Sequence, residues 1–197
     1  MNPTQLPAEG TLALLVLQII AVSGEFPPAF SGHFPGGSSY IGSVIGKLKK
    51  DGLLRAYSKN GLRGLRLTAS AKRLLLQKYP FDLAPYLTGA TETSSLKSEP
   101  ERRLRLHRMA ETLLILHNAQ IPSLPWEKPS MQDWLSNPTL FPVYYSSREF
   151  KALGSLCTKI RNSRMTGVLF TEQAIFPIYN MASTFPRWAH NAEIRLK

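Results

Sequence analysis

The sequence holds one cysteine, Cys157, so it can form no internal disulfide bond and offers no cysteine-based metal site. It also lacks a long apolar segment, because the run from Leu12 to Val22 contains Gln18 and is far shorter than the roughly 20 residues of a spanning helix. No basic residue precedes that run, which favours a buried first helix over the alternative of a signal peptide. We therefore expect a cytoplasmic protein in a reducing compartment, with no membrane partner.

Acidic residues are few as well, with 13 Asp and Glu against 24 Lys and Arg, and the net charge is +11. Such a balance points to an anionic partner, with nucleic acid ahead of a membrane surface. Residues 1–80 hold ten basic and three acidic residues, whereas residues 81–197 hold fourteen and ten. The first segment is therefore the stronger electrostatic candidate.

Histidines show no metal-ligand spacing either. His107 and His117 are ten residues apart, and His33 and His190 are isolated in the sequence. Each fits packing or a surface position better than a ligand role. We expect no metal and no cofactor.

The stretch from Gly36 to Thr68 has the pattern of a helix, a strand, a tight turn and a second strand. Its first part carries apolar residues at helical spacing: Tyr40, Ile41, Val44, Ile45 and Leu48. Asp51-Gly52 ends this helix, Lys59-Asn60-Gly61 supplies turn chemistry, and strands are predicted over 53–57 and 62–67. A helix over 12–23 with Thr11 as N-cap and a short turn in PPAFSGHF precede it, and a helix capped by Thr68 follows it to Tyr79. This order predicts a winged helix.

The segment KKDGLLRAYSKNGLRGLRLTASAKRLLL resembles winged-helix regulators of the multiple-antibiotic-resistance repressor (MarR) and phenolic-acid repressor (PadR) types over residues 11–80. It departs from them in lacking their usual acidic residue and arginine in the wing and in having a short second helix. Across the whole chain, SEPERRLRLHRMAET and SSREFK are similar to segments of uncharacterised winged-helix proteins of bacterial plasmids and integrative elements, including the replication-relaxation type. Both resemblances imply a DNA-binding protein.

Duplex DNA is the expected partner of the winged helix, with its longer helix in the major groove and its basic wing on the backbone or in the minor groove. Polar residues near the start of the helix are placed to touch bases or phosphates, and basic residues on the helix end and hairpin are placed to neutralise phosphates. The alternative is that these charges form a solvated face and that Tyr40 belongs to the core. The predicted DNA-binding residues are Ser38, Ser39, Tyr40, Ser43, Lys47, Lys49, Lys50, Arg55, Lys59, Asn60, Arg63 and Arg66.

Residues 81–97 are rich in small and polar side chains and predict a linker. A capping box at Ser98-Glu99-Pro100-Glu101 then predicts a long helix to Asn118, whose apolar stripe either makes a homodimer or packs in a core. Basic residues crowd its first turns, where Glu99 and Glu101, DNA or an acidic partner would compensate them. This second basic patch comprises Arg102, Arg103, Arg105 and Arg108.

Beyond Asn118, five prolines between 119 and 142 exclude a long helix or a central strand there. A strand over 142–145, a helix over 148–162 with Ser146 or Ser147 as N-cap, and a hairpin from 165–171 and 174–179 predict a small α+β unit. The last residues, WAHNAEIRLK, leave open whether a docked helix ends at Lys197 or a further element follows.

Metal-dependent nucleases of the restriction-endonuclease type have a similar order of strand, helix and hairpin. For an enzyme, the candidate residues are therefore Glu149 and Glu193, with Lys151 and Lys197. The hairpin has no carboxylate within a strand, so any nuclease-like site is expected to be degenerate and Cys157 is expected to pack.

The chain is thus predicted to be α+β: a winged helix-turn-helix domain in 1–80, a linker in 81–97, a long basic helix in 98–118 and a small α+β domain in 119–197. We expect a non-enzymatic, dimeric DNA-binding regulator or accessory factor of a bacterial mobile element. The alternative is a nuclease-like or relaxation-associated enzyme, and a pure protein-interaction module is the third candidate.

Overall fold

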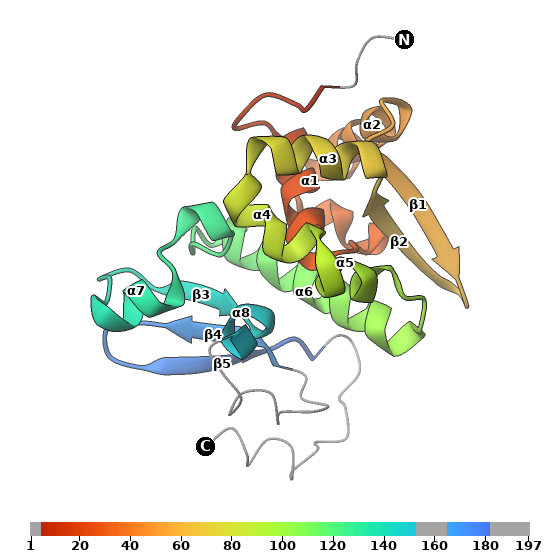
Figure 1. Ribbon diagram of the computed structural model, residues 1–197. Helices are drawn as coiled ribbons and strands as arrows, with labels where there is room; N and C mark the ends of the chain where they lie inside the picture. The colour runs from red at the N-terminus through yellow and green to blue at the C-terminus, as the bar shows by residue number, and fades with distance from the viewer. Residues whose placement is uncertain (1–4, 153–164, 182–197) are drawn as a thin grey trace.

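The computed structural model describes residues 5–152 and 165–181 as an α+β fold. Helices over 12–118 pack together with a two-stranded antiparallel hairpin at their edge, and a three-stranded antiparallel sheet follows later in the chain. The hairpin and the sheet lie at opposite sides of the molecule, with the longest described helix, α6 (Pro100–Asn118), between them (Figure 1). The part of the chain from α1 to α6 therefore positions the hairpin.

The first helix, α1 (Leu12–Ser23), has the predicted bounds. Thr11 caps it by accepting a hydrogen bond from the Leu14 amide, and Gly24 ends it in the left-handed region at φ +94°. Nine of its residues are buried, because later elements pack around it. The apolar run from Leu12 to Val22 is therefore the centre of the core. Across 5–152 and 165–181, no helix combines the length and apolar character needed to cross a membrane.

A short 3-10 helix, η1 (Pro28–His33), leads into α2 (Gly37–Lys50). Gly36 takes the left-handed region at φ +94° directly before α2, a conformation that a side chain would disfavour. Ile41, Ile45 and Leu48 form the buried face of α2. The remaining faces of this helix are largely exposed, as the amphipathic pattern predicts.

The hairpin consists of β1 (Leu54–Lys59) and β2 (Leu62–Leu67), joined by Asn60 and Gly61 at φ +51° and +74°. Two consecutive positive φ angles are the geometry that Asn-Gly turns favour. β2 also forms an antiparallel bridge to Phe26, whose amide donates to the Leu65 carbonyl and whose carbonyl accepts from the Leu65 amide. The hairpin is thus tied through β2 to the segment between α1 and η1.

Residues 81–97 are mostly helical, so the predicted linker is wrong. α3 (Ala69–Lys78), capped by Thr68 as predicted, runs into α4 (Pro80–Leu87) and α5 (Gly89–Leu96). Leu83, Tyr86 and Leu87 of α4 are buried in the same core as α1. The small and polar side chains of this segment misled the composition argument, because burial of these three residues favours helices. Pro80 occupies the first turn of α4, where no amide is needed.

The helix α6 begins at Pro100 with Glu99 as N-cap, and no side-chain hydrogen bond caps it, so the predicted capping box is wrong. Its apolar stripe packs against α1, and Ala110, Leu113 and Leu114 are fully buried. Of the two roles left open for this stripe, the structure shows the core one. Leu104, in contrast, is 39% exposed.

The later part contains η2 (Pro125–Glu127), α7 (Met131–Ser136), β3 (Val143–Ser146), α8 (Ser147–Ala152), β4 (Met165–Phe170) and β5 (Ile175–Tyr179). The strands form a sheet in the order β3-β4-β5 with antiparallel pairs, which confirms the predicted strand and hairpin. Ser146 and Glu149 exchange the two hydrogen bonds of a capping box at the start of α8. The rest of the helix predicted over 148–162, with Cys157, lies outside the described residues.

Candidate nucleic-acid interface

The face of α2 opposite its buried residues carries small polar and basic side chains. Ser39, Ser43, Gly46 and Lys50 lie on the line opposite Ile41 and Ile45, and all four are exposed. Tyr40 is 55% exposed, so the alternative that it belongs to the core is wrong. Every residue predicted on α2 for DNA contact is exposed: Ser38, Ser39, Tyr40, Ser43, Lys47, Lys49 and Lys50.

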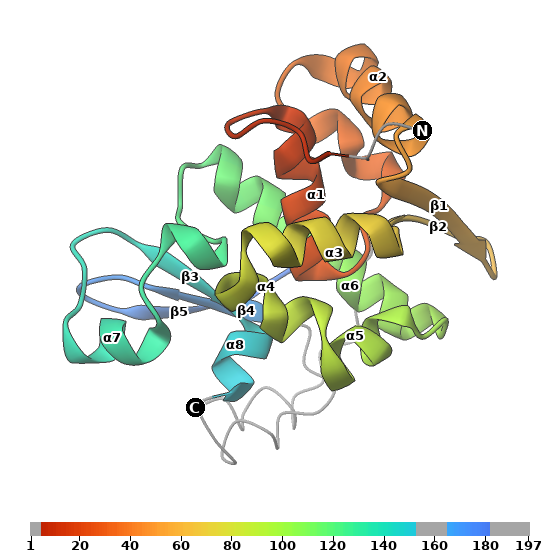
Figure 2. The same ribbon diagram turned by 45° about the horizontal axis from the view of Figure 1, so that its top comes forward.

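The hairpin has two faces that differ in what they contact. Leu54 pairs with Leu67 and Ser58 pairs with Arg63, so these four residues share one face, which carries the leucines into the core. The other face carries Arg55, Lys59 and Arg66. Figure 1 and Figure 2 place α2 and the hairpin at the same end of the molecule, remote from the sheet β3-β4-β5. Arg63 and Asn60 are exposed near the tip.

Arg66 is buried, at 3% exposure, which corrects its prediction as a phosphate contact. Its Nε donates to Glu25 Oε2 at 2.6 Å, and its Nη1 donates to the Leu96 carbonyl at 3.2 Å. A guanidinium enclosed in this way has no access to a DNA backbone. Position along β2 explains the difference from Arg63, because residues 64–67 are buried on both faces of the strand while Arg63 is exposed near the tip.

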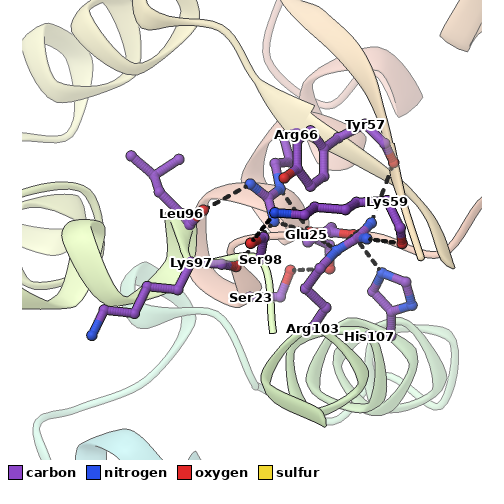
Figure 3. Close-up of polar contacts among 10 residues, drawn as sticks. All are labelled: Ser23, Glu25, Tyr57, Lys59, Arg66, Leu96, Lys97, Ser98, Arg103 and His107. Atoms are coloured by element: carbon purple, nitrogen blue, oxygen red, sulfur yellow. Dashed lines mark hydrogen bonds and ion pairs between the residues drawn. The ribbon is translucent and has the colours of Figure 1, made fainter. Parts of the chain in front are cut away.

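Glu25 is the centre of a buried ionic cluster that joins three parts of the chain (Figure 3). Arg103 of α6 donates to the Glu25 carboxylate at 2.6 Å from Nη2 and at 3.0 Å from Nε. His107, one turn later on α6, places Nε2 2.8 Å from Glu25 Oε1. We call Glu25, Arg66, Arg103 and His107 the Glu25 cluster. Its members come from the segment after α1, from β2 and from α6.

The Glu25 carboxyl is ionised in this setting. Burial by itself would raise its pKa, but hydrogen bonds from His107, Arg103 and Arg66 outweigh burial and lower the pKa to about 2. An ionised carboxylate only accepts hydrogen bonds, so the proton of the His107 contact belongs on Nε2. One carboxylate therefore pairs with both buried arginines and balances one of their two positive charges.

The same arginines hold the outer half of the hairpin. Arg103 donates from Nη2 to the Tyr57 carbonyl at 3.2 Å and from Nη1 to the Lys59 carbonyl at 3.1 Å. The guanidinium carbons of Arg66 and Arg103 lie 3.9 Å and 4.7 Å from the centre of the Tyr57 ring. The Lys59 ammonium donates to Ser98 Oγ at 2.8 Å. These contacts fasten β1 to the start of α6.

The second basic patch therefore has fewer outward-facing members than predicted. Arg103 is fully buried, and its compensating acid is Glu25 instead of the predicted Glu99 or Glu101. Arg105 is exposed, whereas Arg102 and Arg108 are half-buried. Nothing in the sequence near α6 identifies Glu25, which lies 78 residues from Arg103 along the chain.

Gly64 was a further signal in the sequence that the prediction did not use. A Cβ atom at Gly64 would lie 1.8 Å from Glu25 Oε1, so only glycine lets the carboxylate fit beneath the hairpin. A glycine inside a predicted strand, outside the turn itself, typically marks such a close approach. The acid that approaches here could not be identified from sequence alone.

The candidates for an enzyme are not brought together in the described residues. Glu149 forms an ion pair with the buried Lys128, which also donates to the carbonyls of Ser123 and Tyr144. The three ammonium protons of Lys128 are thus used in tying β3 and α8 to the preceding loop. Glu193, Lys197 and the side chain of Lys151 lie outside the described residues. Within residues 5–152 and 165–181, no three His, Cys, Asp or Glu side chains are grouped closely enough to hold a metal ion.

Comparison of the chain with protein-family models, with curated proteins and with solved structures finds no match in any of the three.

Proposed function

We propose that the chain binds duplex DNA, with α2 in the major groove and the hairpin β1-β2 as a wing on the backbone. The order α1, η1, α2 and hairpin, with the Phe26 bridge on β2, supports a winged helix over residues 11–78. The exposed polar face of α2 beside a hairpin with a basic tip carries the proposal. An α-helix fits the major groove, where its outward side chains reach base edges.

The electrostatics of this region support the same function. Asp51 is the only acidic residue between Phe26 and Phe81 in the sequence. Glu25, which precedes this segment, is buried and neutralised by its own arginines. Few acidic residues therefore lie near the exposed cations of α2 and the hairpin tip, which are Lys47, Lys50 and Arg63. Their positive charge is available to an anionic partner.

Two glycines on α2 fit close approach of a partner. Gly42 and Gly46 lie in the helix interior, and a Cβ atom at either would meet nothing within 4 Å. Each costs about 0.5–1 kcal/mol of helix stability relative to alanine, and no packing among the residues that the structure describes requires them. A bare backbone on the outward face lets a groove floor come closer to the helix than side chains would allow.

The biological setting that we propose is a regulator or accessory factor of a bacterial mobile element. It rests on the similarity of SEPERRLRLHRMAET and SSREFK to segments of winged-helix proteins of plasmids and integrative elements. A footprint on DNA flanking the coding region would give the bound sequence and the spacing of half-sites. Because the apolar stripe of α6 is in the core, a homodimer would need another surface.

Binding to a random-sequence duplex, measured by fluorescence anisotropy over a range of salt concentrations, tests the function. We expect measurable binding at low salt and a steep loss with added salt. Replacing both Lys47 and Arg63 with Ala should weaken binding and lower the slope of log K against log salt by about 2. Lys78→Ala is the control, since Lys78 lies at the far end of α3 and pairs with Glu9 at the surface. Absence of low-salt binding, or equal slopes for all proteins, would contradict the proposal.

A further inference from the structure

The hairpin is held by two kinds of contact along its length. Near its base, Leu54, Leu65 and Leu67 are buried in the core. Beyond Tyr57 the residues around the turn are exposed, from Ser58 to Gly61, and none of them belongs to a described hydrophobic cluster. Apolar packing therefore fixes the base of the hairpin but leaves the position of its tip to other contacts.

Polar contacts from α6 and the segment before it supply those restraints. Arg103 donates to the carbonyls of Tyr57 and Lys59, and Lys59 donates to Ser98. Arg103 can reach both carbonyls because Glu25 holds the other edge of its guanidinium at 2.6 Å. Figure 3 shows Arg103 reaching from α6 toward both the carboxylate and the strand.

We propose that Glu25, Arg66 and Arg103 are positioning residues that fix the tip of the hairpin for DNA contact through Asn60 and Arg63. The inference rests on the proposed function and adds that the geometry of the wing is set from outside the winged helix, by α6. In this scheme Arg103 touches no DNA. Its planar fork donates from three nitrogens to both Glu25 oxygens and to the Tyr57 and Lys59 carbonyls, four acceptors that the three protons of a single lysine nitrogen could not all satisfy.

The first measurement is hydrogen exchange in the DNA-free protein. Arg103→Lys keeps the charge opposite Glu25 but removes the fork, so amides of residues 57–64 should exchange at least about tenfold faster while amides of α1 are unchanged. Arg105→Lys, a change to an exposed arginine on the same helix, is the matched control. Equally faster amide exchange in α1 and in the hairpin would indicate a purely global role and would overturn the proposal. Unchanged exchange rates in the hairpin would overturn it as well.

The second measurement is a double-mutant cycle on DNA affinity. In the wild-type background Arg63→Ala should weaken binding on the order of tenfold, whereas in the Arg103→Lys background the same change should weaken it less than about twofold. Additive effects would overturn the positioning role. If the wild-type chain binds no duplex DNA, the proposed function fails, and the exchange measurement still decides whether the Glu25 cluster fixes the tip.

Discussion

Arg63 and Arg66 lie three residues apart on one strand and have opposite surroundings. Arg63 is exposed near the hairpin tip, whereas Arg66 is buried against Glu25 beneath the hairpin. The same contrast separates the outward face of α2 and the tip from the Glu25 cluster as a whole. The arginines of this basic sequence therefore fall into two groups. Those of the first group are exposed and available to an anionic partner, and those of the second are buried and hold the hairpin in place.

The largest expected effect comes from removing the buried acid. Glu25→Gln leaves Arg66 and Arg103 buried beside a neutral amide, so we expect a loss of about 3–5 kcal/mol in the free energy of unfolding. Glu9→Gln is the matched control, because Glu9 forms an ion pair with Lys78 at the surface and should matter little. Urea titration followed by circular dichroism measures both. Similar unfolding midpoints for the two variants would show that the buried Glu25 stabilises the fold no more than the exposed Glu9 does.

The pH dependence of stability sharpens the same contrast. The pKa of Glu25 is about 2 in the folded chain and near 4.5 in its ordinary state, so the unfolded chain binds a proton more readily. The stabilisation by the ionised carboxylate is therefore fully present above about pH 4.5 and is lost as the pH falls toward 2. The loss should be on the order of 3 kcal/mol, measured by urea titrations across this range. A flat profile between pH 5 and 2 would contradict an ionised, arginine-paired Glu25.

Two glycine substitutions give the smallest effects, with opposite signs. Gly64→Ala puts a methyl group into the space of the Glu25 carboxylate and should destabilise the fold by about 1–3 kcal/mol. Gly46→Ala meets open space and should stabilise the fold by about 0.5–1 kcal/mol, while weakening DNA binding if the groove floor approaches there. Thermal unfolding and anisotropy check the two properties. A stabilised Gly46→Ala variant with unchanged DNA affinity would remove the close-approach interpretation.

Local patterns in the sequence predict much of this fold. The bounds of α1, the Asn60-Gly61 turn and the Thr68 cap follow from periodicity and capping chemistry, which act over a few residues. The error at 81–97 arose because composition alone resembles a linker, while burial of Leu83 and Leu87 in the core favours helices.

The candidate site was predicted only where its residues act locally. Amphipathicity correctly placed Ser39, Ser43 and Lys47 on the exposed side of α2. The burial of Arg66 and Arg103 depends on Glu25, which is 41 residues from one and 78 from the other. Contacts over such separations leave no periodic signal in a single sequence. Arg66 and Arg103 were therefore predicted to lie on the surface, although both are buried.

The comparison of Arg63→Ala with Arg66→Ala tests the account most directly, with unfolding free energy and affinity for duplex DNA measured on both variants. We expect Arg63→Ala to keep wild-type stability and to lose DNA affinity on the order of tenfold. Arg66→Ala should instead lower the free energy of unfolding by about 3–5 kcal/mol, because one partner of a buried ion pair is removed. Wild-type DNA affinity in the folded Arg63→Ala variant would contradict the assignment of the hairpin tip to DNA contact.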